Sequence, residues 1–205
     1  MALLGMPFEA RPSDFDETQF PTEAPLDYAR RLAEGKGATV RAGEGELILS
    51  ADTIVDLEGR VLGKPAGPEE ARAILSALRG KTHRVYTALT LRVADAGKVE
   101  AGFCQTDVRM RCFSEAEMEA YIATPSPYDK AGGYAIQDAA FHPVESVRGC
   151  YANVMGLPLC HLTHLFSEFG LSAPAELPWL CQQHLGITCR VYPEILKNHP
   201  VEVKP

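Results

Sequence analysis

A short apolar run, Leu47-Ile-Leu-Ser-Ala51, is closed by Asp52 and constrains the fold more than any other stretch of the chain. Both alternating sides of the run are apolar, which is typical of a strand buried between two layers. We therefore expect a buried strand over residues 47–54. Because open α/β sheets place ligands and catalytic groups at the carboxyl ends of strands, Asp52 is a candidate catalytic residue. An aspartate that only caps a turn is the alternative.

Helix and strand patterns alternate around this run. Helices are expected from apolar spacing and from acidic or capping residues at their starts, and strands from short apolar or alternating stretches. Two consecutive strands in the middle indicate a mixed, twisted central sheet with helices packed on it, an α/β fold. The expected segments are helices over 26–40, 68–78, 115–123 and 154–165, and strands over 47–54, 85–93, 103–112 and 134–147.

The length of 205 residues fits one sizeable domain with an appendage. From Ser167 onward the composition becomes rich in Ser, Ala, Glu and Pro. We therefore predict a domain over residues 1–167, followed by a linker and a short C-terminal extension over 168–205.

The charge and cysteine content limit the partners. A formal net charge of −7 without a basic cluster argues against a nucleic-acid polymer, whereas a small anion needs only two or three local cations. Six cysteines without a C-x-x-C pair favour reduced thiols in the cytoplasm. Because no stretch approaches the about 18 apolar residues of a membrane span, we expect no membrane partner.

Two glycine-containing segments supply cations. In Gly59-x-x-x-Gly63-Lys64-Pro65, the compact ammonium of Lys64 suits a phosphate oxygen, but the spacing and the proline exclude a Walker A loop. In the segment 128–138, Lys130 adds charge, paired glycines allow the backbone to approach a ligand, and Gln137 can donate and accept hydrogen bonds. A charged surface turn is the alternative for the second segment.

Cysteine and histidine residues near the C-terminus raise the possibility of a transition-metal site. One set has helical spacing and the other lies in the extension, but neither provides four ligands at a standard zinc spacing. We favour an exposed helix end and a structural tail over a metal-bound interaction module. The residues are Cys160, His161, His164 and Glu168 in the first set, and Cys181, His184 and Cys189 in the second.

Taken in order, these segments resemble the Maf family of nucleoside triphosphate pyrophosphatases. The resemblance covers about residues 4–165, and its specificity comes from several coincident motifs. The matching stretches are Glu23-Ala-Pro-Leu-Asp-Tyr28-Ala-Arg-Arg-Leu32-Ala with Lys36, Ser50-Ala-Asp-Thr-Ile-Val55, Leu62-Gly-Lys-Pro65, His83-Arg-Val-Tyr-Thr-Ala-Leu-Thr-Leu91, Asp129-Lys-Ala-Gly-Gly-Tyr-Ala-Ile-Gln137 and Asn153-Val-Met-Gly-Leu-Pro158.

The resemblance implies a Maf/inosine-triphosphatase-like fold and hydrolysis of a nucleoside triphosphate between its α- and β-phosphates, assisted by Mg²⁺ or Mn²⁺. It implies a homodimer and house-cleaning of the nucleotide pool, with dTTP and UTP as the substrate type. Asp52 would act as general base or metal ligand, and Glu23 as a second metal-side carboxylate. The implied substrate-binding residues are Lys36, Lys64, Thr87, Lys130 and Gln137.

One part of the family pattern is absent. Family members begin with a strand that leads into a Ser-x-Ser-x-Arg-Arg loop, whose arginines suit bidentate phosphate recognition. Here the segment 1–9 resembles the stretch that comes after that loop, so either the true start lies upstream, or we expect a sheet without the first strand and a weakened phosphate site. A catalytically weakened, nucleotide-binding or regulatory protein is therefore the alternative function.

Overall fold

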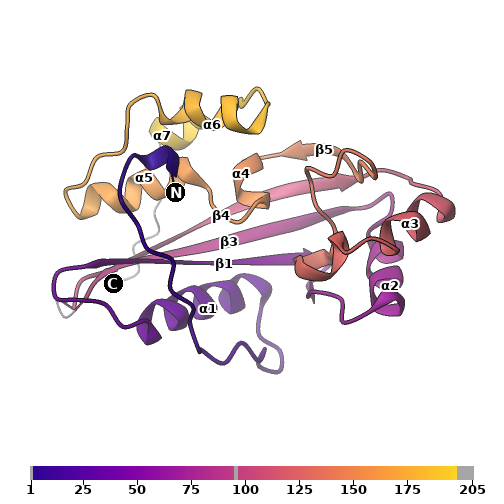
Figure 1. Cartoon of the computed structure of the whole chain (residues 1–205), viewed down its shortest axis with the longest axis horizontal. Coiled ribbons are helices and arrows are strands. Elements are labelled where there is room, and N and C mark those ends of the chain that lie inside the picture. Colours follow the sequence, from indigo (N-terminus) through magenta and orange to yellow (C-terminus); the bar gives the residue numbers. More distant parts are fainter. Residues whose placement is uncertain (1, 95–96, 198–205) are drawn as a thin grey trace.

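Three long strands and two short ones form one five-stranded sheet, shown in Figure 1. The computed structural model describes residues 2–94 and 97–197. The strands lie side by side in the order β2-β1-β3-β4-β5. They are β1 (Leu47–Leu57), β2 (Arg60–Leu62), β3 (Thr82–Val93), β4 (Val99–Met110) and β5 (Val144–Arg148).

Helices cover both faces and one end of the sheet (Figure 1). Helix α1 lies on one face, α5, α6 and α7 lie on the other, and α2 and α3 lie at one end. Short helical turns lie before and between these elements. The helical elements are η1 (Ala2–Leu4), α1 (Pro25–Thr39), α2 (Pro68–Leu78), α3 (Glu115–Ile122), η2 (Ser126–Asp129), η3 (Ala131–Gly133), α4 (Tyr151–Val154), α5 (Leu159–Glu168), α6 (Leu177–Leu185) and α7 (Tyr192–Lys197).

The two faces of the sheet follow from the alternation along its strands. On β1, Ile54 packs with Leu32 of α1, whereas Ala51 packs with the cluster that contains Leu89 and the residues of α5. Because successive side chains of a strand point to opposite faces, Asp52 lies on the same face as Ile54 and points toward α1. This parity places the carboxylate against the helix that carries Lys36.

The predicted α/β class and the central sheet covered by helices are confirmed. The mixture of parallel and antiparallel strands is not seen in the part of the chain that the structure describes, where all four ladders are antiparallel. Parallel neighbours need a crossover helix that returns the chain to the same end of the sheet. Here α2 lies at the end of the sheet, so the chain enters β3 running back along β1 (Figure 1).

Most predicted helix limits agree with the structure. The helices expected at 26–40 and 68–78 occupy 25–39 and 68–78, each with a proline in its first turn. The predicted capping box is present: Ser114 accepts from the Glu117 backbone N–H, and the Glu117 carboxylate accepts from the Ser114 backbone N–H. Local signals therefore suffice to define these helix starts.

Three predicted segments are corrected. The strand expected over 47–54 continues to residue 57, so Asp52 lies in the middle of β1, opposite Ala88 of β3, and not at its carboxyl end. The strand expected over 134–147 is confined to 144–148, because the Asp138 carboxylate accepts hydrogen bonds from the Ala140 and Phe141 N–H groups and bends the chain into turns.

The helix expected over 154–165 is divided into α4 and α5. Gly156 between them has a φ of 96°, which an α-helix does not allow, and Pro158 then provides the entry to α5. The break allows the segment 154–156 to lie at the cavity described below.

The segment after α5 folds back onto the rest of the molecule. Leu177 of α6 is buried in the same cluster as Leu4 of η1 and Leu162 of α5. The proposed division of the chain at residue 167 remains a prediction, and residues 198–205 of that extension lie outside the described residues. Across the described ranges, no helix is long and apolar enough to cross a membrane.

One edge of the sheet is covered only in part. Strand β2 pairs with residues 55–57 of β1, and residues 47–54 have no strand partner on that side among those described. The described segment before α1, residues 2–24, contains η1 and no strand. The cavity described below lies along this open edge of β1.

Candidate active site

A cavity of about 660 Å³ lies along the open edge of β1. This volume falls within the roughly 300–1,000 Å³ of small-molecule sites. We call it the edge cavity. Its charged and amide-bearing lining residues are Glu17, Lys36, Asp52, Lys64, Asp129, Lys130 and Gln137, and its other walls come from β1, the segment 61–64, the segment 131–136 and the segment 154–156.

Asp52 is the most buried carboxylate of the edge cavity, with 9% of its surface exposed. The Lys36 ammonium donates a hydrogen bond to it over 2.5 Å and lies 2.9 Å from the Glu17 carboxylate. Burial raises the pKa of Asp52 above its usual range, and the bond from Lys36 opposes this rise. Burial acts against the charged form of Lys36, but its two carboxylate partners outweigh it and raise the pKa of the ammonium.

Lys64 and Lys130 lie on two loops that are joined to each other. The Gly132 N–H donates to the Gly63 carbonyl over 3.0 Å, so the two lysines line one cavity from neighbouring loops. Lys130 also bonds the adjacent Asp129 carboxylate and the Ser126 carbonyl. The cavity thus has three ammonium groups, counting Lys36, which suits a ligand with several negative charges.

The paired glycines have a structural role. Gly132 has a φ of 73°, and a Cβ there would lie 3.1 Å from a methyl carbon of Val55. Gly133 has a φ of 65° and would meet Pro65. The sequence predicts that these glycines allow the backbone to approach a ligand, whereas in the structure they allow the loop to approach β1 and the Gly63–Pro65 segment.

Two aromatic side chains, Tyr134 and Tyr121, hold the segment after the paired glycines in place. Tyr134 is buried, and its hydroxyl lies 2.7 Å from Nε2 of His83 on β3. Burial lowers the pKa of His83 to about 4, so the imidazole stays neutral near pH 7. Tyr121 of α3 accepts a hydrogen bond from the Ala135 N–H. Gln137, three residues beyond Tyr134, is exposed and lines the edge cavity.

Two residues expected at the site do not line the cavity. Thr87 is fully buried and lies behind Thr53, with 2.9 Å between the two hydroxyl oxygens, and it donates to the Asn153 carbonyl. Glu23 is bound by the Arg31 guanidinium at both carboxylate oxygens. The structure therefore brings together Lys36, Asp52, Lys64, Lys130 and Gln137, but it places Thr87 and Glu23 outside the cavity wall.

Glu17 is a cavity residue that sequence reasoning missed. It lies in the proline- and acid-rich segment before α1, where no periodic pattern separates one carboxylate from another. The Glu17 carbonyl accepts a hydrogen bond from the Tyr28 hydroxyl, which holds the segment against α1. The clue available in the sequence was only the density of acidic residues at 14–17.

Among the described residues, no group of three His, Cys, Asp or Glu side chains could hold a metal ion, and the reading of the C-terminal Cys and His residues as structural stays a prediction. His164 is buried, with Nε2 placed 2.6 Å from the Ile195 carbonyl. This contact ties α5 to α7.

Comparisons with known proteins find one family and several similar relatives. The family described as "Maf-like protein" matches residues 1–169. A protein of Thermomicrobium roseum named "dTTP/UTP pyrophosphatase" is 44% identical over 189 residues, which cover 89% of this chain and 86% of the relative. Proteins with the same name from Dehalococcoides mccartyi (38% identical, 92% and 84% covered) and Anaeromyxobacter dehalogenans (44% identical, 87% and 91% covered) are also similar.

Proposed function

Because the chain belongs to the Maf family, we propose that it is a nucleoside triphosphate pyrophosphatase that converts dTTP and UTP to the monophosphate and pyrophosphate. One observation supports this most: a buried carboxylate, Asp52, shares a nucleotide-sized cavity with the ammonium groups of Lys36, Lys64 and Lys130. Such a hydrolase would remove unwanted pyrimidine triphosphates from the nucleotide pool.

Asp52 acts in this proposal as the general base. A base must be ionised yet able to hold a proton, and burial raises the pKa of Asp52 toward this condition while Lys36 keeps its charge compensated. The carboxylate takes a proton from the water that attacks the α-phosphorus. Lys36 fixes its orientation and also contacts Glu17.

Lys64 and Lys130 neutralise the phosphate chain. The bond between the α- and β-phosphates breaks with growing negative charge on the leaving pyrophosphate, and preorganised cations stabilise that charge. The backbone bond between the two loops holds the lysines in place before the substrate arrives. With Lys36, three ammonium groups of the edge cavity are thus available to the triphosphate.

A divalent cation fits the carboxylates of the edge cavity. Asp52 and Glu17 both contact Lys36, so two carboxylates converge on one positive charge. Mg²⁺ and Mn²⁺ accept one or two carboxylates and complete their shells with water and substrate phosphate oxygens. When bound, the ion would polarise phosphate oxygens. Arg31, which binds Glu23, also donates to the Thr18 carbonyl next to Glu17.

The base preference is assigned to two positions. Gln137 lines the cavity and can donate to and accept from a pyrimidine edge. Thr87 acts as a positioning residue, because its hydroxyl joins Thr53 on the cavity wall to the backbone of Asn153.

A homodimer and a cytoplasmic location belong to the same proposal. The six free thiols of the described chain fit a reducing compartment.

The test is a nucleotide panel with two readouts. The protein is incubated with dTTP, UTP, CTP, dATP and 7-methyl-GTP, with Mg²⁺ or Mn²⁺ or with chelator, and pyrophosphate release is measured beside ligand-induced thermal stabilisation. We expect the fastest release with dTTP and UTP and none with chelator. Stabilisation by dTTP without release above the Asp52→Ala variant would instead identify a nucleotide-binding protein without turnover. Sedimentation of the same sample measures the oligomeric state.

A further inference from the structure

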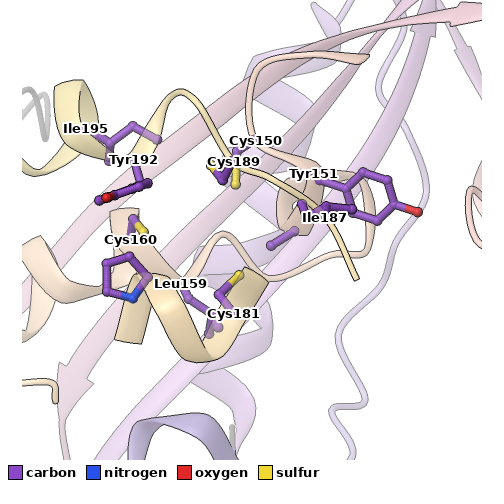
Figure 2. A pocket seen from close by; sticks show the side chains of 11 residues that line it. Cys150, Tyr151, Leu159, Cys160, Cys181, Ile187, Cys189, Tyr192 and Ile195 are labelled. Atoms are coloured by element: carbon purple, nitrogen blue, oxygen red, sulfur yellow. The ribbon is translucent and has the colours of Figure 1, made fainter. Parts of the chain in front are cut away.

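Four thiols from four segments line a second, much smaller cavity, which we call the thiol cavity. Figure 2 shows Cys150 before α4, Cys160 on α5, Cys181 on α6 and Cys189 in the segment after α6. A fifth thiol, Cys104 of β4, packs in a cluster with Cys150. None of these residues contributes to the edge cavity, so the proposed hydrolysis does not explain why they gather.

The C-terminal helices build this cavity. Cys181, Leu185 and Val191 cover the pair Cys104 and Cys150, whose side chains are buried. The cavity holds about 20 Å³, slightly more than the roughly 10–15 Å³ that a water molecule needs. It therefore admits a molecule close to water in size and excludes a nucleotide or a peptide.

Cys104 and Cys150 belong to one cluster of buried residues, and of these two only Cys150 lines the thiol cavity. The neighbouring Cys104 thiol and the backbone N–H groups of Asn153 and Ala152 lower the pKa of Cys150, although burial opposes this. The pair thus places a thiol of lowered pKa at the cavity, with a second thiol packed in the same cluster, which is the arrangement that disulfide formation requires.

We propose that Cys104 and Cys150 are a reversible oxidation site that closes to a disulfide with a hydroperoxide admitted through the thiol cavity. The Cys150 thiolate attacks a peroxide oxygen, the O–O bond breaks, and Cys150 becomes a sulfenic acid while the leaving oxygen takes a proton. The Cys104 sulfur then attacks the Cys150 sulfur, the S–S bond forms, and the departing hydroxide leaves as water with the Cys104 proton. Two thiols lose two electrons, and one hydroperoxide gains them.

A network of buried hydroxyl and amide groups connects this pair to the edge cavity. The Thr106 hydroxyl donates to the Cys150 carbonyl and accepts from the Asn153 amide. The Asn153 carbonyl accepts from Thr87, which in turn contacts Thr53 on the wall of the edge cavity. A disulfide at Cys150 would therefore displace the start of α4 and, through it, the segment 154–156 that lines the edge cavity.

The test is peptide mapping of the full chain after hydrogen peroxide treatment. The protein is exposed to stoichiometric peroxide, alkylated without reduction, digested and analysed by mass spectrometry. We expect one linked pair of peptides containing Cys104 and Cys150, reversed by dithiothreitol, with Cys112 alkylated as the exposed internal control. A linkage between other cysteines, or full alkylation of both residues, would overturn the proposal.

Two variants keep the result interpretable. Cys112→Ser should leave the linkage unchanged, and Cys104→Ala should abolish it and leave a sulfenic acid on Cys150 that dimedone traps. Melting of each variant is recorded beforehand, so that a misfolded sample is excluded. If dimedone labels Cys181 or Cys189 in place of Cys150, the nucleophile has been assigned wrongly.

The effect on the edge cavity rests on the proposed function and is scored separately. Oxidised protein should require several-fold more dTTP for half-maximal thermal stabilisation than reduced protein, and Cys104→Ala should show no such difference. A disulfide without any change in dTTP stabilisation would remove the coupling but leave the oxidation site. A protein that fails to bind dTTP in either state contradicts the proposed function alone, because mass spectrometry detects the disulfide independently.

Discussion

The edge cavity and the thiol cavity lie against the same sheet but differ in their volume, in the elements that cover them and in the chemistry of their lining side chains. The edge cavity is about 660 Å³, borders the open part of β1 and is lined by ion-paired side chains. The thiol cavity is about 20 Å³, is covered by α6 and α7, and is lined by thiols and apolar groups. An incomplete sheet edge leaves room for a charged ligand, whereas a fully covered face leaves room only for small reactants.

The largest effect is expected at Asp52, the buried carboxylate of the edge cavity. Asp52→Asn removes the proton acceptor but keeps the shape, so the rate of dTTP hydrolysis should fall about a hundredfold or more. Asp56→Asn is the matched control. Asp56 is equally buried on the same strand but bonds the Gly59 N–H and does not line the cavity, so its variant should stay within a few-fold of the parent. Equal losses in both variants would indicate a fold effect.

The second effect tests the cations on the two joined loops. Lys64→Gln should lower kcat/KM for dTTP by about ten- to a hundredfold, because one charge that stabilises the leaving pyrophosphate is lost. Lys81→Gln, an exposed lysine near Glu58 outside the cavity, serves as the control and should change the value little. A Lys64 variant with the kinetics of the Lys81 variant would remove Lys64 from the site.

A third prediction concerns pH. Burial raises the pKa of Asp52 and Lys36 opposes that rise, so Lys36→Met should move the acid limb of kcat/KM to higher pH. Lys64→Gln should move it in the same direction by less. Because the folded-state pKa of Asp52 lies above the unfolded value, its contribution to stability is full at low pH and declines as pH rises through the folded pKa. An acid limb that moves downward in the Lys36 variant would refute the pairing.

The smallest effect is expected from the packing of Gly132 against Val55 of β1. Gly132→Ala introduces strain from a positive φ and a contact with Val55, so the free energy of unfolding should fall by about 2–3 kcal/mol. Gly170→Ala has a similar φ of 69° with nothing within 4 Å of the added carbon and should lose only about 1 kcal/mol. Urea denaturation measures both. Equal losses of unfolding free energy in the two variants would mean that the close contact with Val55 does not contribute to the destabilisation.

Sequence patterns predicted the parts of the fold that depend on local chemistry. The helices followed from apolar spacing, from Pro68 with the acidic residues after it, and from the Ser114 capping box. Asp52 was identified from its apolar neighbours together with the family resemblance. The end of β1 was missed because Val55 to Leu57 continue the strand into a hairpin with β2 that is set by tertiary pairing. The antiparallel register of β1 and β3 likewise depends on where α2 packs.

The candidate site was predicted in part. The lysines carried on glycine-marked loops were identified, because glycine and proline leave a clear sequence signal. Glu17 was missed. Thr87 and Glu23 were expected to contact the ligand or its metal ion. Neither strand parity nor composition shows that Thr53 lies between Thr87 and the cavity, or that Arg31 binds Glu23. These contacts join segments distant in sequence or lie within an irregular loop.

The most direct measurement follows the products of dTTP by ³¹P NMR. With Mg²⁺, the parent protein should yield the monophosphate and pyrophosphate in equal amounts without orthophosphate, while Asp52→Asn at the same concentration yields neither and Asp56→Asn matches the parent. Orthophosphate with the nucleoside diphosphate as the product, or an undiminished yield from Asp52→Asn, would contradict a hydrolytic edge cavity built around the Asp52 carboxylate.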